Sequence, residues 1–397
     1  MAARKAAAGT GTIRKKTVTR NGKEYTFWEA RYTAGTDPGT GKQIQRSISG
    51  KTQKEVAKKL KEVTASLDAG TYIAPSKMTV GEWLDIWARD YLGGVKPFTV
   101  ASYTATIKNH IKPALGAIRL EALNAHTIQS FYNSLGKPKG DKPGLSPKTV
   151  KNVHGVLHKA LKQAVLIGYI RSNPADACTL PRIEKKQIKP LDEEQSRRFL
   201  EAIKGHRLED LFTVTLFTGM REGEVLGLTW NCVDFEKGLI LINKQLQREK
   251  KKGGAYIFAP LKNDKARTIT PAPWVMQLLR THRSKQNEQR LRAGELWEDS
   301  SLVFTDELGH HLAIHTVYSA FKKVAASIGC PDARFHDLRH SYAVAAIRSG
   351  DDIKTVQGNL GHATAAFTLD VYGHVTDQMK RESAQRMEQY IKSVLGR

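Results

Sequence analysis

The sequence predicts an α+β protein of several domains: a small N-terminal three-stranded sheet with one helix, a helical middle domain, and a mainly helical C-terminal domain with a small antiparallel sheet. Three observations predict this class. The chain has 397 residues, enough for two or three separate cores. Strand-like runs with turn signals fill the N-terminal segment. Helical spacing of apolar residues dominates the remainder, apart from strand-like runs between residues 239 and 270.

Two proline-containing segments mark the expected domain boundaries. Residues 74–76 (Ala-Pro-Ser) and residues 181–190, which begin and end with proline, have the composition of linkers. We therefore expect domains at residues 1–73, 76–180 and 187–397.

The N-terminal segment alternates in the manner of β-strands at residues 12–19, 25–33 and 43–48. Asn21-Gly22 is a strong hairpin signal, because both residues tolerate the positive φ of a tight turn. Trp28 and Tyr32 alternate along a strand, so we expect them in the small core, with base stacking as the alternative. Residues 52–67 predict a helix whose buried stripe consists of Val56, Leu60, Val63 and Leu67.

This segment is also strongly basic. Residues 1–70 hold 15 Lys and Arg against 6 Asp and Glu, a net charge of +9 (15 − 6). A small basic sheet suits insertion of a β-ribbon into a DNA groove. The candidate DNA-binding residues here are Arg14, Lys15, Lys16, Arg20, Lys23, Arg31 and Arg46.

Apolar residues at helical spacing predict a compact helical domain in the middle of the chain. Thr79 is the expected N-cap of its first helix, which carries Trp83, Leu84, Trp87 and Tyr91 at helical spacing. Further helices are expected at residues 100–111, 127–135 and 149–167. Lys148 and Lys151 are candidate phosphate contacts, as are Lys96, Lys108, Lys112 and Lys159; a solvated helix face is the alternative.

The C-terminal domain is expected to open with a helix that begins at residues 191–194, whose acidic side chains in the first turn favour the helix dipole. The apolar helix 208–217 leads to Arg221, which lies one helical turn from Glu224. This pair is either a simple salt bridge or part of a site that fixes a guanidinium for a phosphate. The strands 239–242, 255–260 and 267–270 are expected to form one antiparallel sheet, with Lys262 at the turn between the second and third.

A second group of reactive side chains lies between residues 334 and 374. His336 and Arg339 share a helix face. Gly350 and Gly361 predict helix ends, so that His362 and Tyr372 could fold back toward this face. Cations of two kinds beside a phenol suit chemistry on a phosphodiester. Ordinary surface histidines and a core tyrosine are the alternative.

Composition limits the partners. The net charge of +24 and the pI near 9.8 indicate a polyanionic partner, with nucleic acid preferred, although a ribosomal or membrane-surface protein would share this charge. The three cysteines are far apart without metal-ligand spacing, which predicts reduced thiols. We find no secretory signal, no run of membrane-spanning length and no nucleotide-binding loop. We expect a cytoplasmic bacterial protein without a metal, other cofactor or membrane partner.

Four motifs follow one another along the chain: Thr-Gly-x-Arg-x-x-Glu, a lysine hairpin, His-x-x-Arg and Leu-Gly-His-x9-Tyr. In this order they resemble the tyrosine recombinase (phage integrase) family from about residue 191 to the end. The middle helices resemble the family's core-site-binding domain. The basic N-terminal sheet resembles the arm-site-binding domain of phage and conjugative-transposon integrases. The resemblance implies a site-specific recombinase that acts on double-stranded DNA at core and arm sites to integrate and excise a mobile element.

The resemblance also implies roles for individual residues. Tyr372 would attack the phosphodiester and form a 3′-phosphotyrosyl link, while Arg221 and Arg339 bind the non-bridging oxygens. Lys262 would protonate the 5′-hydroxyl leaving group, and His336 would assist proton transfer. His362 would bind the phosphate or position the tyrosine, and Glu224 would support the arginine and histidine. A phenol with a pKa of about 10 needs such neighbours to react at neutral pH, and two guanidinium groups supply fixed charge without a metal.

The sequence departs from the family pattern at two places. Gly358 lies inside the helix before residues 360–362, where glycine costs about 1 kcal/mol relative to alanine. Leu261-Lys262-Asn263 stands where Pro-Lys-Thr is common in the family, so Lys265 remains an alternative to Lys262 as the catalytic lysine.

Residues 377–395 form an amphipathic pattern after the tyrosine. This helix either packs on its own domain or, as the resemblance implies, docks on a neighbouring protomer within a DNA-bound homotetramer. A directionality factor is a further expected partner, which the sequence does not identify. A type IB-like topoisomerase and a DNA-binding regulator with a vestigial site are the competing functions. Every expected catalytic position holds a competent residue, which favours the two enzymes.

Overall fold

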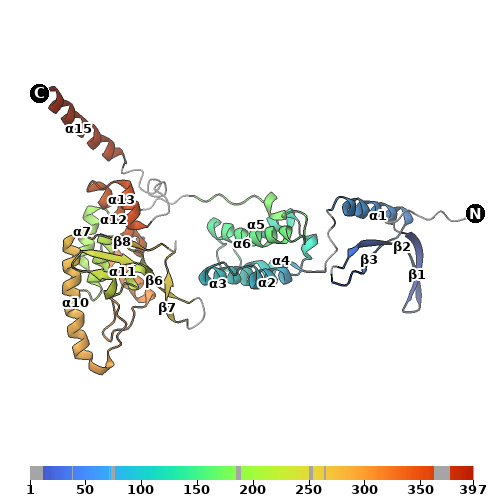
Figure 1. The fold of residues 1–397 in the computed structure, drawn as a ribbon, viewed down its shortest axis with the longest axis horizontal. Coiled ribbons are helices and arrows are strands. Elements are labelled where there is room, and N and C mark those ends of the chain that lie inside the picture. Colours follow the sequence, from blue (N-terminus) through green and yellow to red (C-terminus); the bar gives the residue numbers. More distant parts are fainter. Residues whose placement is uncertain are drawn as a thin grey trace, which may run out of the picture. The chain divides into compact units, whose positions relative to one another are not determined.

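The computed structural model describes residues 12–37, 39–70, 72, 77–184, 189–249, 254–262, 265–361 and 376–396. Contacts divide the chain into two compact units, Met1–Glu184 and Lys185–Arg397. The first unit contains a three-stranded sheet with one helix and a group of helices, and the second is mainly helical with two small sheets (Figure 1). The predicted α+β class is confirmed.

The N-terminal sheet has the order β1 (Thr12–Arg20), β2 (Lys23–Thr36), β3 (Gln43–Gly50), with both pairs antiparallel. Asn21 and Gly22 have φ angles of 49° and 73°, as a two-residue hairpin requires. Helix α1 (Gln53–Asp68) starts after Thr52, whose side chain accepts a hydrogen bond from the Glu55 N–H. The core between α1 and the sheet includes Tyr32 and, partly buried, Trp28, so the prediction that these aromatic residues belong to the core is confirmed.

The middle of the chain forms five α-helices among the described residues. They are α2 (Val80–Asp90), α3 (Pro97–Thr106), α4 (Lys112–Leu115), α5 (Ala125–Leu135) and α6 (Pro147–Leu166). Thr79 and Glu82 form a reciprocal capping box at the start of α2, as the Thr79 N-cap prediction requires. Trp83 on α2 is fully buried, and its indole N–H donates to the Ala160 carbonyl of α6 over 2.9 Å.

Two expectations for these helices need correction. The helix expected at residues 100–111 begins earlier, at Pro97, because proline fits the first turn of a helix, and it continues through a π-helical turn (Ile107–Ile111) into α4. Tyr91, expected on the apolar face of α2, is 41% exposed because it caps the end of the helix rather than lying within it.

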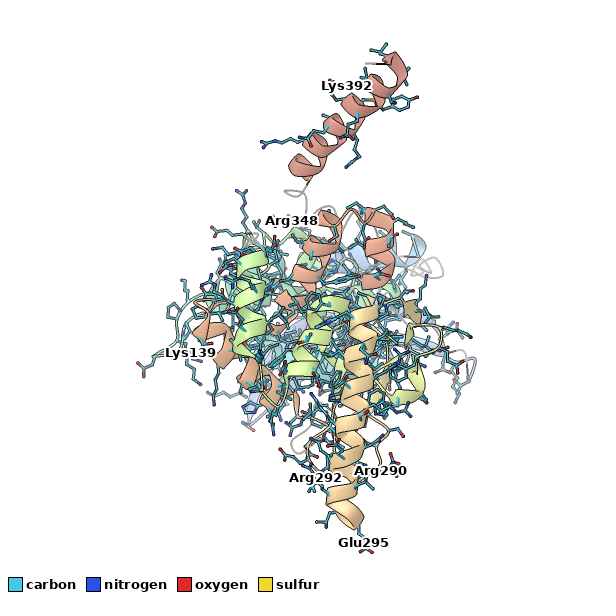
Figure 2. All side chains as sticks on the ribbon, turned by 90° about the vertical axis from the view of Figure 1, so that its left-hand side faces the viewer. Lys139, Arg290, Arg292, Glu295, Arg348 and Lys392 are labelled. Atoms are coloured by element: carbon cyan, nitrogen blue, oxygen red, sulfur yellow. The ribbon has the colours of Figure 1, made fainter. Side chains whose placement is uncertain are left out.

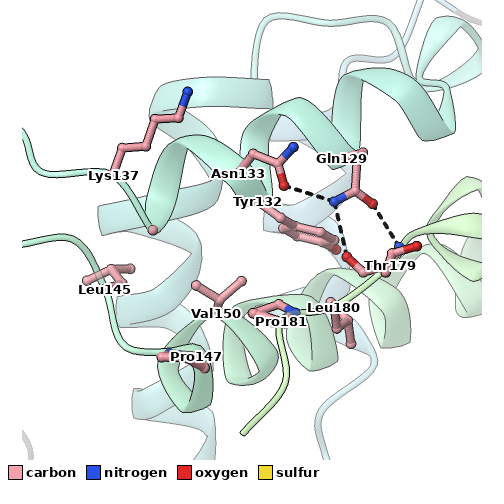
Figure 3. Close-up of a pocket in the computed structure, with 11 residues that line it drawn as sticks. Gln129, Tyr132, Asn133, Lys137, Leu145, Pro147, Val150, Thr179, Leu180 and Pro181 are labelled. Atoms are coloured by element: carbon pink, nitrogen blue, oxygen red, sulfur yellow. Dashed lines mark hydrogen bonds between the residues drawn. The ribbon is translucent and has the colours of Figure 1, made fainter.

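The segment that leaves the helices lies against α5 and α6. Gln129 on α5 accepts a hydrogen bond from the Thr179 N–H over 2.7 Å and donates to the Thr179 carbonyl over 3.0 Å (Figure 3). The backbone at Thr179 is therefore fixed at both its polar groups. Leu180 and Pro181 follow directly beside the pocket shown there.

The second unit is built from helices around a shared apolar core. The described α-helices are α7 (Glu193–Ala202), α8 (Glu209–Thr218), α9 (Glu222–Leu226), α10 (Pro273–Ala293), α11 (Ile314–Ser327), α12 (Phe335–Arg348), α13 (Ile353–Leu360) and α15 (Thr376–Leu395). Helix α8 lies at the centre of this core, since nearly all its residues from Leu211 to Thr218 are buried. Helix α10 ends in basic residues, among them Arg290 and Arg292, which favour the negative end of the helix dipole (Figure 2).

The strands of this unit form two sheets and not the single sheet expected from the sequence. The strands β4 (Val233–Asp234), β5 (Leu239–Ile242) and β8 (Arg267–Ile269) form one, and β6 (Lys244–Arg248) pairs with β7 (Tyr256–Pro260) in the other. Strand β7 was expected beside β8. The sequence of β6 is mostly polar and only Leu246 in it is buried, so its pattern did not predict a strand that pairs with β7.

No helix within these described parts combines the length and the apolar composition needed to cross a membrane.

Candidate active site

The end of helix α8 places Arg221. Gly219 ends the helix in the left-handed conformation, with φ of 65°, and a Cβ atom there would clash with the Tyr342 ring. Glycine is therefore required both by the backbone and by the close packing of α12. Arg221 follows two residues later, directly before α9.

Glu224 is the central acceptor of the site. Its side chain is 1% exposed and accepts from Arg221 Nη1 over 2.7 Å and from the Arg221 backbone N–H over 2.9 Å. Arg267, on β8, donates to both carboxylate oxygens, over 3.0 and 2.7 Å. Burial alone would raise the pKa of Glu224, but the bonds and charges of Arg267 and Arg221 outweigh it and lower the pKa to about 2. Glu224 is thus a fixed anion between two guanidinium groups.

Helix α12 contributes His336 and Arg339. Arg334 and Asp337 form a capping box at its start, which fixes the first turn that carries both residues. Arg339 is 2% exposed, and its Nη1 donates to the Gly219 carbonyl over 2.7 Å. A buried guanidinium held in this way ties α12 to the end of α8.

The end of helix α13 joins the three arginines. Arg267 Nε donates to the Asn359 carbonyl over 2.8 Å, Arg339 Nη2 donates to the Leu360 carbonyl, and Arg221 Nη2 donates to the Gly361 carbonyl over 3.0 Å. The last carbonyls of a helix lack intrahelical partners and carry the negative end of the helix dipole, so cations stabilise them. We refer to Arg221, Glu224, Arg267 and Arg339 as the arginine cluster.

His336 lies beside this positive charge. Burial, which disfavours the charged ring, is the largest cause that lowers the pKa of His336. The charges of Arg339, Arg221 and Arg334 lower it further, to about 4, and Asp337 opposes them. Its ring is therefore neutral at pH 7 and has one nitrogen that can accept a hydrogen bond or a proton, although the lowered pKa makes it a weaker base than an ordinary histidine. The His340 ring lies 5.0 Å from it, and burial also lowers the pKa of His340 to about 4.

The structure brings together Arg221, Glu224 and Arg339. His336 lies near enough for the charges of Arg339 and Arg221 to lower its pKa. Lys262 lies in a turn after β7 and Lys265 lies three residues further on; both are exposed, and the choice between them stays open. His362 and Tyr372 lie outside the described residues. Among the residues that are described, no group of three His, Cys, Asp or Glu side chains is placed to hold a metal ion.

Arg267 is the member of the cluster that the sequence analysis missed. It was treated only as the first residue of a strand. One signal was available: an arginine beside the buried Ile269 must find acceptors inside the protein.

The candidate DNA-binding residues of the N-terminal sheet lie on both of its faces. Strand register places Arg14, Lys16 and Arg31 on the face opposite α1. These three converge on Glu29, at 2.8, 3.2 and 3.8 Å. Lys15 and Arg46 pair with Trp28 and Tyr32 and so share the face that α1 covers. Lys23 lies on the open face; the Arg20 side chain is outside the described part.

The helical lysines differ in their surroundings. Lys148 is exposed at the start of α6, and Lys151 is partly exposed one turn later. Lys112 and Lys159 already have partners, since Lys112 pairs with Asp85 over 2.7 Å and Lys159 donates to the Tyr103 hydroxyl over 2.8 Å. These contacts favour a structural role for Lys112 and Lys159.

A mainly helical unit whose buried carboxylate orients guanidinium groups is suited to bind and cleave a phosphodiester. Comparison with known proteins identifies the class. The family model described as "Phage integrase family" matches residues 189–379, and the model described as "Phage integrase, N-terminal SAM-like domain" matches residues 79–136. A "Tyrosine recombinase XerC-like" protein of Caldanaerobacter subterraneus subsp. tengcongensis is 30% identical over 94% of this chain and 98% of its own length. An integrase of Streptomyces ambofaciens is 30% identical over 87% of this chain and 88% of its own.

Solved structures share the fold. The Tn1549 transposon integrase in complex with transposon right end DNA has a TM-score of 0.67 at 23% identity, covering 78% of this chain and all of that one. A lambda integrase dimer bound to a COC′ core site has a TM-score of 0.54 at 19% identity, covering 90% and 95%. The chain belongs to the phage integrase family of tyrosine recombinases, enzymes that cleave and rejoin DNA. The resemblance drawn from the four motifs and the enzyme class it implied are confirmed.

Proposed function

We propose that the chain integrates and excises a mobile element by cutting and rejoining double-stranded DNA at specific sites through a covalent link to Tyr372. The observation that carries the proposal is the arginine cluster, in which Arg221, directly before α9, and Arg339, on α12, donate to carbonyls of the same helix end. Two guanidinium groups in fixed positions are suited to the non-bridging oxygens of one phosphodiester. Family membership supports this use of the cluster.

In the proposed reaction the Tyr372 oxygen attacks the phosphorus, and the bond to the 5′-oxygen breaks. The phenol proton passes to a base, and the candidate is His336, whose neutral ring has a nitrogen free to accept it. Lys262 or Lys265 gives a proton to the 5′-oxygen as it leaves. Rejoining reverses these steps with a 5′-hydroxyl from a second strand, so the covalent link conserves the energy of the broken bond.

The test is covalent trapping. A pool of nicked duplexes with a randomised central segment is incubated with the protein, adducts are isolated in detergent, and their DNA is sequenced. We expect adducts that share a sequence, none with Tyr372→Phe, and wild-type amounts with the matched control Tyr169→Phe. The absence of any adduct with the wild-type protein would refute the enzyme function and favour a DNA-binding regulator. Relaxation of supercoiled DNA without strand exchange between two sites would indicate a topoisomerase.

The leaving group distinguishes the two lysines. A substrate with sulfur in place of the bridging 5′-oxygen releases a thiolate, which leaves without a proton because a thiol is far more acidic than an alcohol. The alanine variant of the true general acid should cleave the oxygen substrate slowly and the sulfur substrate at the wild-type rate. If neither Lys262→Ala nor Lys265→Ala shows this rescue, neither lysine is the acid.

We propose that residues 1–73 bind arm sites, residues 76–180 bind the core site and residues 187–397 carry out the chemistry. The separate apolar cores of the sheet, the helices and the second unit support this division. Deletion of residues 1–70 should leave core-site adducts intact and remove protection of distal sites in footprinting. Unchanged distal protection would contradict the assignment. A directionality factor remains a prediction.

We propose that α15 docks on a neighbouring protomer and joins four chains on DNA. Its described apolar side chains are exposed: Met387, Tyr390, Ile391 and Val394 are between 43% and 65% accessible. A groove of about 860 Å³, lined by apolar residues of α7, α8 and α12 such as Leu200, Phe217 and Val344, is a suitable acceptor. Ile391→Asp should leave adduct formation in place and reduce assembly of two-site complexes in gel-shift assays. Unchanged assembly would favour packing of α15 on its own domain.

A further inference from the structure

Arg267 lies at the point where the arginine cluster meets the end of α13. It is the only member of the cluster that contacts both Glu224 oxygens through its guanidinium and also holds α13. Its Nε, Nη1 and Nη2 atoms each donate a hydrogen bond to a protein oxygen. These bonds direct all three nitrogens of the Arg267 guanidinium toward protein oxygens.

The contacts define a chain of dependence. Glu224 would be a buried carboxylate with one guanidinium partner if Arg267 were removed, and its two oxygens would no longer be held in one orientation. Arg221 takes its orientation from the same two oxygens, through its Nη1 and its backbone N–H. Gly361 also lies against Arg267, since a Cβ there would be 3.0 Å from the Arg267 Cδ atom.

We propose that Arg267 is a positioning residue of the recombinase, which orients Arg221 for the phosphate through Glu224 and holds the end of α13 against the same cluster. The proposal rests on the proposed function, in which Arg221 binds the scissile phosphate. Arg267 itself does not touch DNA in this arrangement. It acts through geometry, and the planar fork of an arginine is needed because two oxygens and a carbonyl must be bound at once.

The test compares Arg267→Gln and Arg267→Lys with the control Arg280→Gln. Arg280 is an exposed arginine of α10 that also donates to a backbone carbonyl, that of Phe235 over 2.8 Å, outside the cluster. At saturating DNA, Arg267→Gln should slow adduct formation about 10²-fold, the loss expected when a catalytic group is misplaced by about 1 Å. Affinity for DNA should fall by no more than about tenfold, the loss of one phosphate contact, and saturating DNA removes this loss from the measured rate. Arg267→Lys should not rescue the rate, and Arg280→Gln should leave it unchanged.

A neutral scissile linkage separates positioning from general damage. A methylphosphonate at the cleavage position lacks the charged oxygen that Arg221 is proposed to bind, so the ratio between wild type and Arg267→Gln should fall toward one. A ratio that stays near 10² would show that Arg267 does not act through Arg221. Full activity of Arg267→Lys would show that charge alone suffices and would overturn the positioning role.

Binding of inorganic phosphate provides a readout that does not require cleavage. We expect Arg267→Gln and Arg221→Gln each to weaken phosphate binding about tenfold, with no further loss in the double variant because both act on one contact. Additive losses, or an unchanged dissociation constant, would refute the proposal. A wild-type protein that binds phosphate in this way but forms no adduct would instead count against the proposed function.

Discussion

Two glycines three residues apart, one inside α13 and one at its end, should change the stability of this helix in opposite directions when replaced by alanine. Gly358 lies inside the helix, and apart from its chain neighbours and the nearby backbone of its own helix, a Cβ there would meet no atom within 4 Å. Gly358→Ala should therefore stabilise the helix by about 1 kcal/mol, the difference in helix propensity. Gly361 ends the helix with φ of 63°, and its Cβ would lie 3.0 Å from Arg267. Gly361→Ala should cost about 1–2 kcal/mol for the left-handed backbone, and the contact with Arg267 adds to this cost.

Hydrogen exchange of the α13 amides measures these local free energies without unfolding the whole chain. A change of 1–2 kcal/mol corresponds to a factor of about 5–30 in the population of the open helix. Gly358→Ala should slow exchange about fivefold, and Gly361→Ala should accelerate it by at least that factor. Faster exchange in Gly358→Ala, or unchanged exchange in Gly361→Ala, would refute the reasoning. Because α13 leads directly to the segment with His362 and Tyr372, we also expect Gly358→Ala to alter the cleavage rate; an equal rate would show that helix stiffness is irrelevant to chemistry.

Three further measurements test the electrostatics. The folded pKa of Glu224 is about 2 and its ordinary value is 4.5, a difference that corresponds to about 3 kcal/mol of folding stability. This contribution is present above pH 4.5 and is lost as the pH falls toward 2. The urea concentration at the midpoint of unfolding should therefore fall less steeply with acid in Glu224→Gln than in the wild type. NMR titration should find the His336 ring neutral from pH 7.5 down to pH 5, and a midpoint near 6.5 would contradict the lowered pKa. Glu29→Gln should release Arg14 and Lys16 from their ion pairs. The slope of log K against log salt for duplex binding should then steepen by about 0.9 for each additional phosphate contact. The control Glu24→Gln, an exposed residue on the other face of the sheet, should leave this slope unchanged.

The parts of the fold that follow from local rules were predictable. Thr79 and Asn21-Gly22 mark a helix start and a hairpin because capping and tight turns need particular residues at fixed positions. The pairing of β6 with β7 was not predictable, since the pattern within a strand says nothing about its neighbour and β6 is mostly polar.

The site divides in the same way. Arg221, Glu224, His336 and Arg339 could be selected from motif order and spacing. Arg267 could be placed on one strand face with Ile269, but its role could not be assigned, because that role depends on Glu224, 43 residues away, and on the Asn359 carbonyl, 92 residues away. Every residue has a backbone carbonyl, so the identity of a residue does not predict which carbonyl accepts a given hydrogen bond. Only the folded chain shows that three arginines share one helix end.

That shared helix end links two events at different places in the chain. Arg221 and Arg339 hold the carbonyls of Gly361 and Leu360 with part of their donors and are proposed to bind a phosphate with the remainder. Coupling between two binding events that share the same groups is reciprocal. If bound DNA strengthens the hydrogen bonds from these arginines to the carbonyls at the end of α13, then a subunit contact that stabilises the same helix end raises the affinity for DNA by the same factor. A neighbouring protomer could then control how tightly this one binds its site without touching the DNA.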